Sequence, residues 1–276
     1  MKNTKKTSAA DKFIYVEDIK KSKRIVIKIG SASLTHATGK LNLKRIENLV
    51  KTIADLTNMG KEIILVTSGA VSAGIAKLGM KPPLAKIEDR KAAAAVGQAE
   101  LMKIYDRFFS SFGIKIAQML LSRDIIENEV SRKEAEETFS VLIKMGCVTI
   151  VNENDAVSTA ELKFSGNDIL SAYVSKLCKA DLLINFSDVD GLYDKNPAKF
   201  KDAEIIHHVK ELKPEILAYA GGAGSERGTG GMVTKLQAAQ MIFEDNTPMV
   251  IANSKNPEIL YDILDGKIAG TYIGNV

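Results

Sequence analysis

Lys28 is the residue whose type and position point most clearly to chemistry. It interrupts the apolar run Arg24–Ile29, which reads RIVIKI, and lysines are rarely buried without a partner. Gly30 and Ser31 follow at once, so a phosphate can approach the backbone closely while the ammonium group neutralises its charge. The sequence therefore predicts an anion-binding lysine, and the alternative is a solvated lysine on an edge strand.

A second lysine follows a glycine-rich segment. Residues 221–231 (GGAGSERGTGG) contain 6 of the 20 glycines. Met232 to Lys235 follow, and then a helical pattern formed by Leu236, Ala239 and Ile242. Free backbone N–H groups and the helix dipole at such a helix start attract an anion. We therefore predict a second anion-binding segment here. A flexible surface loop that ends at a helix cap is the alternative.

Polar residues also follow three other apolar runs. They are Ser68 to Ala70, Asn152 to Asp155 and Ser187 to Gly191. The first two groups have side chains suited to a small polar substrate. A plain strand-to-helix turn is the alternative for the first, and an Asx-turn with an N-cap for the second.

Six short runs rich in β-branched residues are typical of buried strands. They are Arg24–Ile29, Glu62–Thr67, Ile114–Leu121, Cys147–Val151, Asp181–Phe186 and Met249–Ala252. Helical spacing lies between them, as in residues 43–56 ahead of Gly60 and 91–109 ahead of Gly113. This alternation predicts an α/β sandwich on a mostly parallel sheet. In such a sheet ligands bind beyond the carboxyl ends of the strands, where all the polar residues above would lie.

Composition narrows the function classes. The chain has 276 residues, is 45% hydrophobic and 26% charged, and carries a net charge of +4. These values are typical of an ordinary globular protein, and no apolar run approaches the roughly 18 residues of a membrane helix. The mild positive charge suits anionic small molecules, whereas the absence of Trp argues against an aromatic platform for nucleic acid.

Several kinds of catalytic site have no signal in the sequence. We find no GxxxxGK[ST], GxGxxG, HExxH or GxSxG pattern, and His36, His207 and His208 are not spaced as a metal site. The two cysteines, Cys147 and Cys178, lie far apart and offer neither a zinc site nor a disulfide framework. Because residues 1–23 also lack a secretory signal, we expect a polar lead-in there and a cytoplasmic protein.

Six separated motifs together resemble the amino acid kinase family, from about Arg24 to Ile273. They are IKIGSASL (27–34), KEIILVTSGAVSAG (61–74), KAAAAVGQAELM (91–102), VNENDAV (151–157), SDVDGLYDKNP (187–197) and GTGGMVTKLQAA (228–239). Residues 61–74 and 151–157 are most similar to members that phosphorylate L-glutamate. One motif alone would be weak, whereas six in the same order form a specific pattern.

The resemblance implies a fold and a reaction. The fold is a three-layer αβα sandwich over residues 24–276, with an acceptor lobe of about 24–180 and a nucleotide lobe of about 181–276. The reaction is transfer of the γ-phosphoryl group of ATP to the side-chain carboxylate of L-glutamate, which gives L-glutamyl 5-phosphate in the first step of proline synthesis. The resemblance also implies feedback inhibition by proline and a homodimer or homotetramer.

Matching motif positions imply residue roles. Lys28 and Lys235 contact the transferring phosphoryl group, and Asp168 holds both lysines. The acceptor contacts are Ser68, Asn152, Asp155 and Asn167. The ATP contacts are Lys28, Ser187, Asp188, Thr229, Gly230, Gly231, Met232, Val233, Thr234 and Lys235. No protein metal site is expected, because Mg²⁺ would be held mainly by the phosphates and by water.

The chain departs from the family pattern before Asn167, where Ser165 and Gly166 stand in place of a usual acidic residue. Many bacterial members also carry a C-terminal domain resembling RNA-modifying enzymes. Because this sequence stops at Val276, we expect the kinase domain alone.

Two alternative functions stay open. The first is the same fold with another acceptor: N-acetylglutamate, aspartate, carbamate or UMP. The second is a catalytically silent sensor of proline or nucleotide, which the presence of Lys28, Asp168 and Lys235 argues against.

Overall fold

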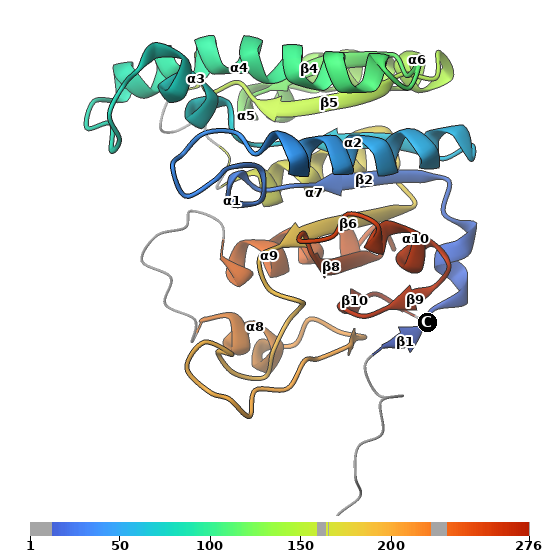
Figure 1. The fold of residues 1–276 in the computed structure, drawn as a ribbon. Helices are drawn as coiled ribbons and strands as arrows, with labels where there is room; N and C mark the ends of the chain where they lie inside the picture. Colours follow the sequence, from blue (N-terminus) through green and yellow to red (C-terminus); the bar gives the residue numbers. More distant parts are fainter. Residues whose placement is uncertain (1–12, 159–163, 165, 222–230, 276) are drawn as a thin grey trace, which may run out of the picture.

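A single large sheet forms the centre of the molecule. The computed structural model describes residues 13–158, 164, 166–221 and 231–275, and within them eight strands hydrogen-bond in the order β4-β5-β3-β2-β6-β8-β10-β7 (Figure 1). The first six of these are mutually parallel, and β10 runs antiparallel to β8. The prediction of an α/β fold on a mostly parallel sheet is confirmed.

Each of the six predicted strands is present with its ends shifted by at most two residues. They are β2 Arg24–Lys28, β3 Glu62–Val66, β4 Ile116–Leu121, β5 Val148–Glu153, β6 Leu182–Ser187 and β8 Met249–Asn253. Four further strands were not predicted: β1 Ile14–Tyr15, β7 His208–Val209, β9 Lys267–Ile268 and β10 Thr271–Ile273. Two or three residues are too few to show a period in the sequence.

Helices cover both faces of the sheet, as a three-layer sandwich requires (Figure 1). Ile25 and Ile27 of β2 belong to one buried cluster, with α2 Leu43–Asn58, α4 Ile87–Ser110 and α10 Ile259–Leu264. The intervening Val26 belongs to the other, with α6 Glu129–Lys144, α7 Asn167–Cys178 and α9 Met232–Phe243. The strands therefore bury both sets of alternating side chains, which explains their near-continuous apolar sequences.

Short helices complete the chain. They are the 3₁₀ helix η2 Glu17–Lys21 and the helices α1 Ser31–Leu34, α3 Ala70–Leu78, α5 Arg123–Glu127 and α8 Pro214–Gly221. Helix η2 lies within residues 1–23, the predicted polar lead-in. It places the side chain of Ile19 in the buried cluster that also contains side chains of α2 and α10. The boundary between an acceptor lobe and a nucleotide lobe near residue 180 stays a prediction.

Two glycines set the direction of helices that begin at the carboxyl edge of the sheet. Gly69, directly before α3, has φ +103°, and Gly166, directly before α7, has φ +110°. L side chains rarely adopt these backbone conformations. An acidic residue in place of Gly166 would be strained in this conformation.

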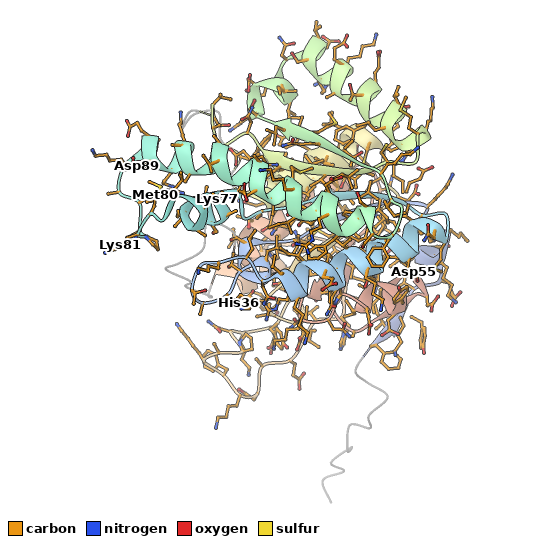
Figure 2. All side chains as sticks on the ribbon, turned by 45° about the horizontal axis from the view of Figure 1, so that its top comes forward. His36, Asp55, Lys77, Met80, Lys81 and Asp89 are labelled. Atoms are coloured by element: carbon orange, nitrogen blue, oxygen red, sulfur yellow. The ribbon has the colours of Figure 1, made fainter. Side chains whose placement is uncertain are left out.

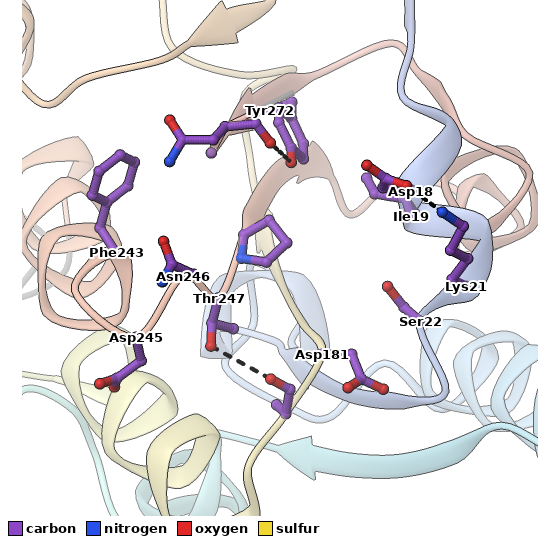
Figure 3. A pocket seen from close by; sticks show the side chains of 14 residues that line it. Asp18, Ile19, Lys21, Ser22, Asp181, Phe243, Asp245, Asn246, Thr247 and Tyr272 are labelled. Carbon is purple, nitrogen blue, oxygen red and sulfur yellow. Dashed lines mark hydrogen bonds and ion pairs between the residues drawn. The ribbon is translucent and has the colours of Figure 1, made fainter.

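A hollow of about 520 Å³ lies at the opposite, amino end of the sheet (Figure 3). Its walls include Ser22, Asp181 and Pro248, which come just before β2, β6 and β8. Ligands of open parallel sheets bind at the carboxyl ends instead. The hollow therefore lies at the opposite end of the strands from the candidate site residues that the sequence predicted.

Candidate active site

Three charged side chains meet beyond the carboxyl edge of the sheet. Lys28 Nζ lies 2.6 Å from Asp168 Oδ1, and Lys235 Nζ lies 3.1 Å from Asp168 Oδ2. Lys28 ends β2, Asp168 lies in the first turn of α7, and Lys235 in the first turn of α9. We call these three residues the charged centre. The predicted grouping of two lysines around one carboxylate is present.

The charged centre is almost sealed from solvent: Asp168 is 1% exposed, Lys28 6% and Lys235 5%. Strand β2 lies between β3 and β6 in the middle of the sheet. The alternative interpretation of Lys28 as a solvated edge-strand lysine is therefore wrong.

Burial and mutual repulsion set the protonation of the charged centre. Burial lowers the pKa of Lys28, and the charge of Lys235 lowers it further, against the opposing attraction of Asp168. Burial acts to raise the pKa of Asp168, but the charges of Lys28 and Lys235 outweigh it and lower that pKa to about 2. Asp168 is therefore ionised at neutral pH.

Two neutral groups complete the surroundings of the Asp168 carboxylate. The hydroxyl of Thr234 donates to Oδ2 at 2.7 Å, and the amide Nδ2 of Asn185 donates to Oδ1 at 2.9 Å. Asn185 lies on β6, in register with Lys28 of β2. Oδ1 therefore accepts from Lys28, from Asn185 and, at 3.3 Å, from Lys235, while Oδ2 accepts from Lys235 and Thr234.

Beside the charged centre lies a group of uncharged polar side chains, which we call the amide cluster: Ser68, Gln98, Asn152 and Asn167. Asn167 Nδ2 donates to Ser68 Oγ at 2.8 Å and to Asn152 Oδ1 at 3.0 Å. Asn152 Nδ2 in turn donates to Gln98 Oε1 at 3.0 Å. Ser68 and Asn167 are half-buried at the front, whereas Asn152 and Gln98 are buried behind them.

The amide cluster contains three of the four predicted acceptor residues. The fourth, Asp155, is half-buried in the turn that follows β5. Asn167 and Asp168 are consecutive at the start of α7, so the amide cluster and the charged centre share one helix N-terminus. A helix start adds partial positive charge there, which favours an anion between the two groups.

The predicted nucleotide residues lie on the other side of the charged centre. Ser187 is the buried last residue of β6, and Asp188 is exposed just beyond it, close enough to Lys28 to affect its pKa. Gly231 precedes α9, whose first residues Met232, Val233 and Thr234 lead to Lys235. Thr229 and Gly230 lie outside the described residues.

Asn185 and Gln98 contact this site, and our sequence reasoning did not select either. Asn185 interrupts the apolar run LLINF just as Lys28 interrupts RIVIKI, so the same signal was available. Gln98 lies in an alanine-rich helix and faces the core from it. A lone amide on the buried face of a helix is a weaker signal, because it can equally be a satisfied core residue.

Among the described residues, no three His, Cys, Asp or Glu side chains gather as a metal site. His36 lies in the loop between α1 and α2, where Figure 2 labels it, while His207 and His208 lie at β7. Cationic lysines and helix N-termini fit phosphate oxygens rather than a bare metal ion.

Comparison with known proteins gives the same family as the sequence motifs. Residues 23–253 match the Amino acid kinase family. Glutamate 5-kinase from Clostridium perfringens is 49% identical to this chain, covering 92% of this chain and 96% of the relative. Glutamate 5-kinase from Enterococcus faecalis is 46% identical, covering 92% and 95%.

Solved structures of other kinases share the fold. Carbamate kinase from Giardia lamblia bound to AMP-PNP has a TM-score of 0.66 at 17% identity, covering 92% of this chain and 99% of that one. UMP kinase from Bacillus anthracis has a TM-score of 0.63 at 18% identity, covering 92% and 96%. Within the described residues, no helix is both long and apolar enough to cross a bilayer. The chain belongs to the amino acid kinase family, and its curated relatives at 44–49% identity are glutamate 5-kinases.

Proposed function

We propose that this chain transfers the γ-phosphoryl group of ATP to the side-chain carboxylate of L-glutamate, the first step of proline biosynthesis. The observation that carries the proposal is the charged centre, with two buried lysines on one carboxylate. It lies between the amide cluster and the start of α9. The names of the curated relatives support the same reaction.

The chemistry needs charge neutralisation more than proton transfer. A carboxylate is already a nucleophile at pH 7, so a glutamate oxygen attacks the γ-phosphorus, the bond to the β-phosphate oxygen breaks, and ADP leaves. The barrier is repulsion between two anions. Lys28 and Lys235 reduce it by stabilising charge on the transferring group, in a buried site where such interactions are strong.

Asp168 has a positioning task in this mechanism. Two ammonium groups that approach one phosphoryl group repel each other, and the carboxylate between them offsets that repulsion. With its pKa lowered to about 2, Asp168 keeps its charge across the physiological range. It holds both lysines without accepting a proton from either.

The acceptor binds at the amide cluster in this proposal. Ser68 and Asn167 are the accessible members. Ser68 offers an O–H to a glutamate carboxylate, whereas the amide N–H groups of Asn167 already donate to Thr67, Ser68 and Asn152 and hold the cluster together. Asn152 and Gln98 support Asn167 from behind. Asp155 supplies an acceptor for the ammonium group of the amino acid.

The nucleotide binds on the side of Ser187, Asp188 and the start of α9. Mg²⁺, when bound to ATP, neutralises part of the phosphate charge and is held by phosphate oxygens and water. We also propose a cytoplasmic homo-oligomer, dimeric or tetrameric, that proline inhibits. Light scattering and proline titration of the reaction test the last two points.

An ADP-release assay with a panel of acceptors tests the reaction. Glutamate, aspartate, N-acetylglutamate, carbamate and UMP are compared at equal concentration with MgATP. Glutamate should give the highest kcat/KM. A higher value for another acceptor would move the chain to another branch of the fold, and no turnover with any acceptor in a folded protein would favour the silent sensor.

A further inference from the structure

We propose that Asn185 is a positioning residue that holds the Asp168 carboxylate in the orientation from which it contacts both lysines. This inference rests on the proposed phosphoryl transfer, in which both lysines must stabilise the same group. It assigns a function to a residue that contacts neither substrate. Asn185 acts through Asp168 alone.

The distances show that the carboxylate contacts both lysines in its present orientation. Lys28 Nζ approaches Asp168 Oδ1 at 2.6 Å. Lys235 Nζ lies 3.1 Å from Oδ2 and 3.3 Å from Oδ1, so it is nearly equidistant from both oxygens. A carboxylate that is free to rotate could turn both oxygens toward one ammonium group and leave the other lysine poorly held.

Asn185 and Thr234 together oppose that rotation. The Asn185 amide donates to Oδ1 at 2.9 Å, and the Thr234 hydroxyl donates to Oδ2 at 2.7 Å. Because a donor is fixed on each oxygen, rotation of the carboxylate would break both hydrogen bonds. The Asn185 donor lies on the Lys28 side, because Asn185 and Lys28 are register partners on adjacent strands.

The orientation of the amide follows from its partner. An ionised carboxylate only accepts hydrogen bonds, so the Asn185 nitrogen must face Asp168. The amide oxygen of Asn185 is then buried, and it has no hydrogen-bond partner in the described part of the chain.

That unpaired oxygen indicates that stability is not the reason for an asparagine at this position. Asn185 is 0% exposed, and its neighbours in β6 are apolar. A leucine, which has the same number and branching of side-chain heavy atoms, would avoid an unsatisfied buried acceptor, which destabilises a folded protein. The asparagine therefore carries a cost that its hydrogen bond to Asp168 explains.

The chain offers a matched control. Thr149 of β5 is also 0% exposed, and its hydroxyl oxygen likewise has no partner among the described residues. Thr149→Val removes a buried unsatisfied oxygen from the same sheet without touching Asp168. Asn185→Leu removes both the unsatisfied oxygen and the N–H donor to Asp168.

The experiment measures steady-state kinetics and melting temperature for the wild type and both variants. We expect Asn185→Leu to lower kcat about tenfold or more, the scale of a lost hydrogen bond to a charged group. Its KM for glutamate should stay within about threefold of the wild type, since the amide cluster is intact. Thr149→Val should leave both constants unchanged, and neither variant should melt at a much lower temperature.

A double variant separates positioning from a general structural effect. In the Asp168→Asn background there is no carboxylate to orient, so adding Asn185→Leu should change kcat by less than about twofold. Independent losses that multiply would contradict the proposal. A folded Asn185→Leu protein with kcat near that of the wild type would overturn it as well.

Asn185→Thr is the second variant if the leucine protein does not fold, because its hydroxyl is too short to replace the amide. The same loss of kcat is expected. If both fail to fold while Thr149→Val folds, Asn185 is a structural residue and the proposal is wrong. The wild-type protein tests the proposed function separately. If the wild type has no turnover, the proposed function is wrong. If the wild type turns over normally and the Asn185 variants do as well, only the positioning role of Asn185 is wrong.

Discussion

The charged centre and the amide cluster are adjacent, but the first consists of charged side chains and the second of uncharged polar side chains. The charged centre consists of formal charges that are 1–6% exposed. The amide cluster uses uncharged groups, and its front members, Ser68 and Asn167, are half-buried. Charges in a dry site act strongly on charge that develops during reaction, while neutral groups in a wetter site discriminate by shape and hydrogen bonding. The comparison predicts that the two regions control different kinetic constants.

The largest effect should come from removing one lysine of the charged centre. Lys28→Met or Lys235→Met should lower kcat by roughly 100-fold or more, the scale for losing one preorganised donor, while KM for glutamate changes far less. Steady-state kinetics with circular dichroism as the folding check measures this. Lys195→Met, which breaks an ion pair with exposed Asp202, is the control and should leave kcat unchanged.

The two lysines should also fail to act independently. Because both are held by Asp168, the combined Lys28→Met and Lys235→Met loss should fall short of the product of the single losses. A single variant with nearly normal kcat, in a protein shown to be folded, would contradict the assignment of the charged centre to the chemistry.

The next prediction is a loss of activity at high pH, caused by deprotonation of Lys28 in the charged centre. Only the charged form of Lys28 stabilises the phosphoryl group, and burial followed by the charge of Lys235 lowers its pKa. As pH rises through that lowered pKa, kcat/KM, which reports the free enzyme, should fall about tenfold per pH unit, beginning below the ordinary lysine value of 10.5. A pH profile of kcat/KM for ATP, with enzyme stability checked at each pH, measures it.

The Lys235→Met variant tests whether Lys28 is the group that controls this pH dependence. Lys235→Met removes the repelling charge, so the pKa of Lys28 should rise and the falling limb of its residual activity should move to higher pH. A limb that stays at the wild-type position would mean that another group controls it.

Sequence reasoning and structure agree where a strong local signal exists. The six apolar runs predicted the main strands because buried parallel strands need apolar side chains on both faces. Lys28 stood out for the same reason, since a charge inside such a run is rare. Asn185 gave a similar but weaker signal, because an uncharged amide in a strand is less unusual than a lysine.

Other parts of the site have no local signal at all. Asp168 stands two residues after Gly166 near a helix start and resembles an ordinary acidic residue of a first helical turn. Only the family resemblance selected it, since its contact with Lys28 depends on how α7 crosses β2. Thr234 was assigned to ATP, yet in this structure its hydroxyl donates to Asp168. Such contacts depend on tertiary packing rather than on sequence periodicity.

At the acceptor end of the site, effects should appear in KM. Asp155→Asn removes the negative charge proposed to face the ammonium group, so KM for glutamate should rise about tenfold, the effect of roughly 1.4 kcal/mol of lost binding. KM for ATP should change little. If the ATP constant moves instead, the placement of residues 151–157 at the acceptor end is wrong.

The smallest effect is expected from Ser68→Ala. The hydroxyl of Ser68 accepts from Asn167 Nδ2 at 2.8 Å, which leaves its own O–H free to donate to the acceptor carboxylate. Its loss removes one hydrogen bond worth about 1 kcal/mol, so KM for glutamate should rise roughly fivefold. Asn167 keeps Asn152 as a second partner, so the amide cluster should stay in place and kcat should change by less than about twofold. A fall in kcat as large as that of the lysine variants would show that the two regions are not separable, because loss of a neutral contact would then have disturbed the charged centre.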